Sequence, residues 1–167
     1  ENYVQALLFT PELPEGRVRW RLAAPAPKGA RIEISYQGTP VGSGETDEDG
    51  CGSAVLPPEQ LHLWSPEAPN LYDVTITLGD DTVRSYFAMR TVGTGKDAAG
   101  QPCPLLNGQP YFHHGVLDQG YWPDGLYTAP SDEALIYDIT LMKRLGFNML
   151  RKHIKIEPMR WYYHCDR

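Results

Sequence analysis

Side chains able to do chemistry gather in two short stretches of the sequence. The first contains His113, His114 and the run from Asp118 to Trp122, and the second contains Arg151, His153, Lys155 and Glu157. Carboxylate, imidazole and guanidinium groups hydrogen-bond hydroxyls, and aromatic rings offer broad apolar faces on which a sugar ring can stack. The combination favours a carbohydrate ligand, with Asp118 and Trp122 as candidate binding residues.

Each of these stretches follows a predicted strand. Asn107-Gly108 lies between apolar runs and predicts a tight hairpin, because both turn positions need a positive φ. A buried strand is predicted over 111–116, and a long loop over 117–130, of a length that is usually functional in compact domains. A second strand is predicted over 147–150, and its end leads directly into the second stretch.

A helix is predicted between the two strands. Ser131 or Asp132 caps its start, and Gly146 stands where a left-handed residue ends a helix. The buried stripe of this helix is formed by Leu135, Ile139, Met142 and Leu145. Another helix is expected to open at Glu157-Pro158, with proline in its first turn. The order strand, helix, strand, helix is typical of a barrel or a doubly wound sheet, in which function gathers at the carboxyl ends of the strands.

A parallel strand–helix–strand unit cannot bury its own faces without neighbouring strands and covering helices. A complete (β/α)8 barrel needs about 250 residues, and roughly 60 follow the hairpin here before the sequence ends at Arg167, within the second predicted helix. We therefore expect the chain to be a piece of a larger enzyme. We also expect self-association through the exposed barrel strands, because unpaired strand edges are templates for pairing with another chain.

The first 95 residues predict a β-sandwich. Apolar and polar residues alternate over 18–22, 32–36, 71–78 and 82–89, which is the pattern of strands with one buried face. With weaker runs at 3–9 and 51–56 we expect about seven short strands, the number typical of an immunoglobulin-like sandwich. Trp20 is interpreted as a core residue of this domain. The polar, glycine-rich stretch 93–102 is interpreted as a linker or loop before the next domain.

Composition excludes several classes of function. The net charge of −6, without a basic run, argues against nucleic-acid binding. No apolar stretch approaches the 18 or so residues that would span a membrane. The three cysteines, Cys51, Cys103 and Cys165, are too few and too widely spaced for a disulfide framework or a zinc motif. We expect no cofactor and no metal site within this chain, while a bacterial cytoplasmic or periplasmic location stays open.

Five motifs, in the right order, carry a resemblance to a known family. They are Leu63-Trp64-Ser65-Pro66-Glu67-Ala68-Pro69-Asn70-Leu71-Tyr72, Arg90-Thr91-Val92-Gly93, Leu106-Asn107-Gly108-Gln109-Pro110, the passage from Lys143 to Arg151, and Trp161-Tyr162-Tyr163-His164-Cys165-Asp166. Together these segments resemble glycoside hydrolase family 2, the β-galactosidase, β-glucuronidase and β-mannosidase group. The resemblance implies an immunoglobulin-like sandwich over 1–95 and the start of a TIM barrel over 96–167.

The resemblance also implies an activity and roles for single residues. Members of the family cleave β-glycosides with retention, using two carboxyl groups about 5 Å apart, and both follow later barrel strands than those present here. No catalytic residue is therefore expected in this chain, which should be inactive alone, and both carboxyl groups are expected downstream of Arg167. Arg151 matches the family's active-site arginine after the second barrel strand. His153 is a weaker match, because many members place the histidine three residues after the arginine rather than two.

Two readings of the residues remain to be weighed. A pairing of Glu157 with Asp124 as catalytic carboxylates is rejected, because nothing in the sequence sets their spacing. The first hypothesis is part of a retaining β-glycosidase that binds a carbohydrate substrate. The alternative is a non-catalytic sandwich module that binds carbohydrate or protein.

Overall fold

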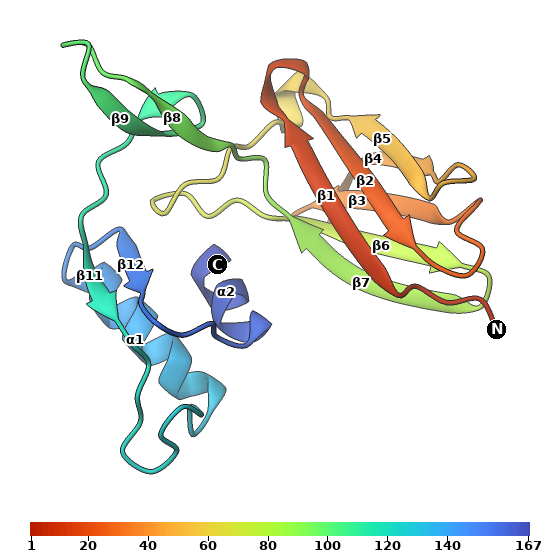
Figure 1. Cartoon of the computed structure of the whole chain (residues 1–167). Helices are drawn as coiled ribbons and strands as arrows, with labels where there is room; N and C mark the ends of the chain where they lie inside the picture. The colour runs from red at the N-terminus through yellow and green to blue at the C-terminus, as the bar shows by residue number, and fades with distance from the viewer. The chain divides into compact units, whose positions relative to one another are not determined.

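The computed structural model describes residues 1–167 and divides them into two units. The sandwich unit comprises 1–93 and 105–109, and the C-terminal unit comprises 94–104 and 110–167. Neither of the two helices has the length and apolar character that crossing a lipid bilayer requires. The chain is mostly β, and the predicted sandwich is confirmed (Figure 1).

Two antiparallel sheets form the sandwich unit. One contains β1 (Ala6–Glu12), β2 (Arg17–Ala23) and β5 (Cys51–Val55), in the order β1-β2-β5. The other, ordered β4-β3-β6-β7, contains β3 (Arg31–Tyr36), β4 (Thr39–Glu45), β6 (Tyr72–Leu78) and β7 (Asp81–Phe87). Strict alternation of apolar and polar residues aims one face of each strand at the core. In β2, for example, Val18, Trp20 and Leu22 are buried while Arg19 and Arg21 are exposed.

Trp20 is the central residue of this core, as predicted from the sequence. Its indole lies against glycines of both sheets, because a Cβ on Gly44 of β4 would come within 2.8 Å of the ring and one on Gly52 of β5 within 2.5 Å. The indole Nε1 is buried and has no hydrogen-bond partner. The contribution of Trp20 is therefore packing between the sheets rather than a polar contact.

A third sheet stands where the sequence predicts an irregular linker over 93–102, and that prediction was wrong. β8 (Val92–Lys96), β9 (Pro102–Leu106) and β10 (Gln109–Pro110) pair in the order β10-β9-β8. The turn between β8 and β9 is held by Asp97, whose Oδ1 accepts from the backbone N–H of Ala99 and of Gln101. A polar, glycine-rich composition therefore encodes a strand turn here rather than a loop.

The predicted hairpin at Asn107-Gly108 is confirmed, with φ values of 52° and 77°. Asn107 also acts through its side chain. Its Oδ1 accepts from the N–H of Thr91 at 3.0 Å, and its Nδ2 donates to the carbonyl of Trp64 at 2.9 Å. One turn residue thus joins the hairpin to two other segments of the sandwich unit.

The C-terminal unit contains a parallel pair of strands, β11 (Gly115–Asp118) and β12 (Met149–Lys152), with α1 (Asp132–Arg144) between them in sequence and α2 (Met159–Asp166) after them. The predicted strand over 111–116 was wrong in its first half, since β11 begins at Gly115. Asn148 explains the difference, because its side chain binds the backbone at Phe112 and His114 in place of a neighbouring strand.

Helix α1 begins and ends as its sequence predicts. Ser131 is the N-cap, and its Oγ accepts from the N–H of Ala134. At the other end Gly146 has a φ of 90°, and the N–H groups of Gly146 and Phe147 donate to the carbonyls of Lys143 and Met142. This pair of bonds is a Schellman motif. The predicted apolar stripe is only partly buried, because Leu145, at the C-cap, is exposed.

Candidate functional site

The carboxyl ends of β11 and β12 converge on a cluster of four charged side chains. In the parallel register Leu117 lies opposite Arg151 and Asp118 lies opposite Lys152. Because successive residues of a strand point to opposite faces, these two pairs lie on opposite faces of the sheet. Leu117 and Arg151 are exposed, whereas Asp118 and Lys152 are half-buried.

The ion-pair cluster consists of Asp118, Lys152, Lys155 and Glu157. Lys152 Nζ lies 2.6 Å from Asp118 Oδ2 and 2.9 Å from Glu157 Oε1, and it stands 4.5 Å from the centre of the Trp161 ring. Lys155 Nζ lies 3.1 Å from the same Glu157 oxygen. The side chains of Lys152, Lys155 and Glu157 are only 9%, 8% and 3% exposed. One buried carboxylate therefore bridges two buried ammonium groups.

The local backbone turns these side chains toward one another. Ile154, between the two lysines, has a φ of 54°, which is an outlier for a β-branched residue. Gly120 approaches from the opposite side with a φ of 62°, and a Cβ there would lie 2.2 Å from Glu157 Oε1. Only glycine lets the chain pass so close to the cluster.

Burial lowers the pKa of Lys152, but its hydrogen bonds to Asp118 and Glu157 outweigh burial and leave this pKa above its ordinary value of 10.5. The lysine is therefore charged at neutral pH and remains paired. Neither carboxylate of the cluster is available as a free acid or base, because each is bound to an ammonium group. The cluster can fix backbone, but it cannot transfer protons to a substrate.

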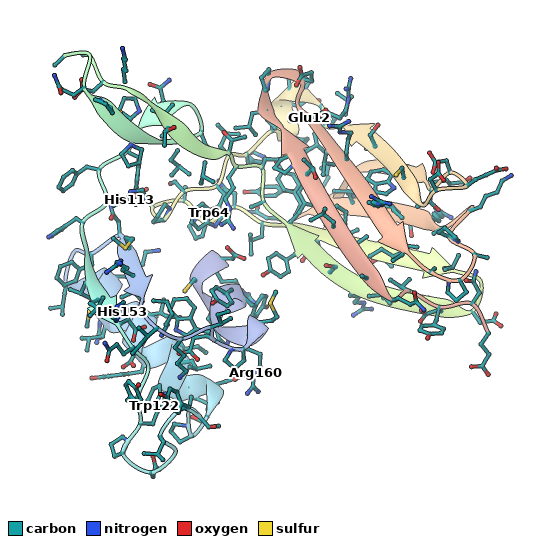
Figure 2. All side chains as sticks on the ribbon, viewed as in Figure 1. Glu12, Trp64, His113, Trp122, His153 and Arg160 are labelled. Carbon is teal, nitrogen blue, oxygen red and sulfur yellow. The ribbon has the colours of Figure 1, made fainter.

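The four residues predicted from the sequence occupy different environments. Arg151 is exposed on the face opposite the cluster. Asp118 belongs to the cluster, and its carbonyl accepts from the N–H of His153 at 2.9 Å. The His153 ring Nδ1 lies 3.0 Å from Gln119 Nε2. Trp122 lies in the loop after β11, and its indole Nε1 is buried without a partner (Figure 2). The structure thus brings Asp118 and His153 together and leaves Arg151 apart.

Arg167 is the residue after which the sequence predicts the catalytic carboxylates. It is exposed and forms the C-cap of α2. Its guanidinium donates to the hydroxyl of Tyr163, one turn earlier, and stands 5.3 Å from the centre of that ring. Arg167 therefore belongs to the end of the helix rather than to the ion-pair cluster, and the location of the catalytic carboxylates beyond it stays a prediction.

Sequence reasoning missed three residues that shape this site: Gly120, Lys152 and Tyr127. Lys155 Nζ donates to the carbonyls of Gly120 and Tyr127, at 2.6 and 2.7 Å, and so joins both ends of the 119–130 loop. The alternation of Lys155 and Glu157 with the exposed Ile154 and Ile156 was the available signal, since it places the charged residues on the inner side. No group of three or more His, Cys, Asp or Glu side chains is arranged to hold a metal ion.

Cys165, on α2, gives a prediction from its surroundings. Burial raises the pKa of its thiol to about 12, and the thiolate is the reactive form. We expect iodoacetamide at pH 8 to leave Cys165 unmodified in the folded chain while labelling Cys51 or Cys103, as read by peptide mass spectrometry. Labelling in urea, where all three thiols should react, is the control. Modification of Cys165 at the rate of the others would contradict the assignment.

Comparison with known proteins places the chain in a family. Residues 3–90 match glycosyl hydrolases family 2, and this chain belongs to that family. A β-galactosidase of Leuconostoc mesenteroides is 33% identical over 125 residues, which cover 71% of this chain and 11% of that protein. A β-galactosidase of Vibrio cholerae is 39% identical over 106 residues, which cover 62% of this chain and 10% of that protein.

Solved structures show the same fold. The β-glucuronidase of Faecalibacterium prausnitzii superposes with a TM-score of 0.85 at 22% identity, covering 100% of this chain and 27% of that one. A β-galacturonidase of Eisenbergiella tayi superposes with a TM-score of 0.74 at 23% identity, covering 99% of this chain and 31% of that one. The chain therefore spans less than a third of the length of each of these four proteins.

Proposed function

We propose that this chain is part of a retaining β-glycosidase, β-galactosidase-like, that hydrolyses O-glycosyl bonds of a carbohydrate substrate. The observation that carries the proposal is the order of parts: a sandwich of glycosyl hydrolases family 2 is followed by a parallel strand–helix–strand unit whose carboxyl edge carries polar side chains. Relatives named β-galactosidase support the choice of substrate class.

In this proposal residues 1–95 are the sandwich domain and residues 96–167 begin a (β/α)8 barrel. The parallel pairing of β11 with β12, joined through α1, supports the barrel, because such units occur in sheets whose faces are covered by helices. The free edges of β11 and β12 would be paired in the complete barrel. In this chain they are the surfaces through which we propose self-association.

Retaining hydrolysis needs one carboxyl group as acid and base and another as nucleophile, about 5 Å apart. Asp118 and Glu157 both contact Lys152, but their charges are neutralised and the Glu157 side chain is 3% exposed. They are unsuited to the two roles. We therefore propose that both catalytic carboxylates of the parent enzyme follow Arg167 and that the 167 residues alone are inactive.

Arg151 is proposed to orient or hydrogen-bond a catalytic carboxylate in the parent enzyme. Its exposure on the face of β12 away from the ion-pair cluster supports this role, because its donors are not taken up by that cluster. His153, Asp118 and Trp122 are proposed as supporting or substrate-binding residues. For Asp118 the support is indirect, since its carboxylate holds Lys152 and also accepts from the N–H of Gly120 at 2.9 Å.

The test compares the parent enzyme with this chain on a panel of aryl β-glycosides. We expect turnover by the parent alone, and the preferred glycoside names the sugar. Arg151→Ala in the parent should lower kcat/KM by about 10- to 100-fold, as expected for a lost charged hydrogen bond, whereas Arg160→Ala, an exposed arginine on α2, should not. A folded parent without turnover would move the proposal to a carbohydrate- or protein-binding sandwich.

A further inference from the structure

We propose that the 119–130 loop forms a preformed carbohydrate subsite whose stacking surface is the tyrosine pair, Tyr121 and Tyr127. The ligand class is a pyranose ring of the substrate, so the inference rests on the proposed function. It differs from the sequence-based expectation, in which Trp122 is the aromatic residue that meets the sugar.

The tyrosine pair presents aromatic surface with its polar ends satisfied. The two hydroxyls lie 2.9 Å apart, and the ring centres lie 4.9 Å apart at an angle of 52°. The side chains are well exposed, with relative accessibilities of 49% for Tyr121 and 58% for Tyr127. The hydrogen bond to Tyr127 raises the pKa of Tyr121, so both hydroxyls are protonated at neutral pH. Two exposed rings in fixed orientation suit the apolar face of a sugar.

The loop that carries the pair is held at its base and across its tip. Lys155 Nζ binds the carbonyl of Gly120, directly before Tyr121, and the carbonyl of Tyr127 itself, and it stands 5.6 Å from the centre of the Tyr127 ring. Across the tip, Trp122 and Leu126 exchange backbone hydrogen bonds of 2.8 and 2.9 Å. A single buried ammonium group therefore positions both tyrosines, which lowers the ordering cost of binding.

Trp122 is the weaker candidate for stacking. Its residue is half-buried, and its indole N–H is buried without an acceptor, so it is not presented to a ligand as the tyrosines are. Lys155 is a positioning residue in this arrangement, because its three donors face carbonyls and Glu157 rather than the exposed rings.

The experiment measures KM and kcat of the parent enzyme carrying Tyr121→Ala or Tyr127→Ala. We expect KM to rise about 3- to 10-fold, the effect of one aromatic contact, with a smaller change in kcat. Tyr137→Ala is the matched control, since Tyr137 lies on α1 and is 58% exposed, as is Tyr127. Tyr121→Phe keeps the ring and should keep KM within about 2-fold.

A second readout separates this inference from the proposed function. Ring proton resonances of Tyr121 and Tyr127 in this chain are followed by NMR during titration with methyl β-D-galactopyranoside and with the other methyl β-glycosides of the panel. Shifts confined to the pair support the subsite, even if the parent shows no turnover. An active parent whose Tyr121 and Tyr127 variants match Tyr137→Ala, or absence of shifts at both rings, overturns it.

Discussion

Replacing Glu157 with alanine is expected to lower the free energy of unfolding of the C-terminal unit by about 3–5 kcal/mol, the cost of breaking a buried ion pair on one side. Glu157 is the carboxylate shared by Lys152 and Lys155, and all three side chains are less than a tenth exposed. Without it, Lys155 keeps only carbonyl partners and Lys152 keeps only Asp118. Two buried positive charges would then lack most of their compensation.

The measurement is urea unfolding followed by circular dichroism at 222 nm, which reports α1 and α2, both in the C-terminal unit. Glu48→Ala is the matched control, because Glu48 also pairs with a lysine, Lys28, at 2.8 Å but is 81% exposed. It should change stability by less than about 1 kcal/mol. Equal effects of the two substitutions would mean that the cluster does not hold this unit together.

The same cluster sets a pH dependence with a definite sign. The folded-state pKa of Lys152 is raised above its ordinary value of 10.5, so the folded state holds this proton more tightly than the unfolded chain. The associated stabilisation is complete below pH 10.5 and is lost as the pH rises through the folded-state pKa. The Glu157→Ala effect should accordingly be undiminished at pH 7 and should shrink only in the alkaline range.

Trp20→Ala is expected to destabilise the sandwich unit by about 3–5 kcal/mol, the range for removing a buried aromatic side chain. The indole fills the space that Gly44 and Gly52 leave open between the two sheets. Trp20→Phe should cost much less, because the indole Nε1 makes no hydrogen bond that would be lost. The contrast between the two variants tests whether packing alone explains the position.

Amide hydrogen exchange of β3 and β6, which carry the buried Ile32, Ile34, Val74 and Ile76, reports this stability directly. Faster exchange in Trp20→Ala than in Trp20→Phe is the expected order. Leu8→Ala, an exposed position on β1, is the control and should leave exchange within about 0.5 kcal/mol of the original. Similar loss of protection in the alanine and phenylalanine variants would assign a polar role to the indole.

Elements with a local signal were predictable from the sequence. The hairpin of β6 and β7 follows from two alternating runs around Gly79-Asp80, and its register pairs Leu78 with Asp81. The ends of α1 follow from Ser131 and Gly146, whose roles depend only on neighbouring backbone groups. In each case the residues that set the geometry are within a few positions of one another.

β4 is a strand that the alternation of residue types does not reveal. It reads Thr39-Pro40-Val41-Gly42-Ser43-Gly44-Glu45, and only Val41 is a buried apolar residue. The two glycines are inward positions where the side chains of neighbouring strands occupy the space: Leu56, Ala54 and Ile34 at Gly42, and Trp20 at Gly44. Their small size is explained only by residues distant in the sequence.

The ion-pair cluster could not be derived from sequence for a similar reason. Asp118 and Lys152 are 34 residues apart and meet because the parallel register places them opposite one another. A shift of one residue would have paired Asp118 with Arg151 and moved each side chain to the other face. The residue types were visible in the two polar stretches, but their partners were set by register.

The side-chain bonds of Asn107 also bear on the chemical ageing of the protein. An asparagine followed by glycine is prone to deamidation, in which the glycine nitrogen attacks the side-chain amide carbon and a succinimide forms. Here the amide is bound at both of its atoms, to the N–H of Thr91 and the carbonyl of Trp64, and the backbone is fixed at a positive φ. Folding therefore shields a link that the unfolded chain would expose to hydrolysis, and storage life becomes tied to the stability of the sandwich unit.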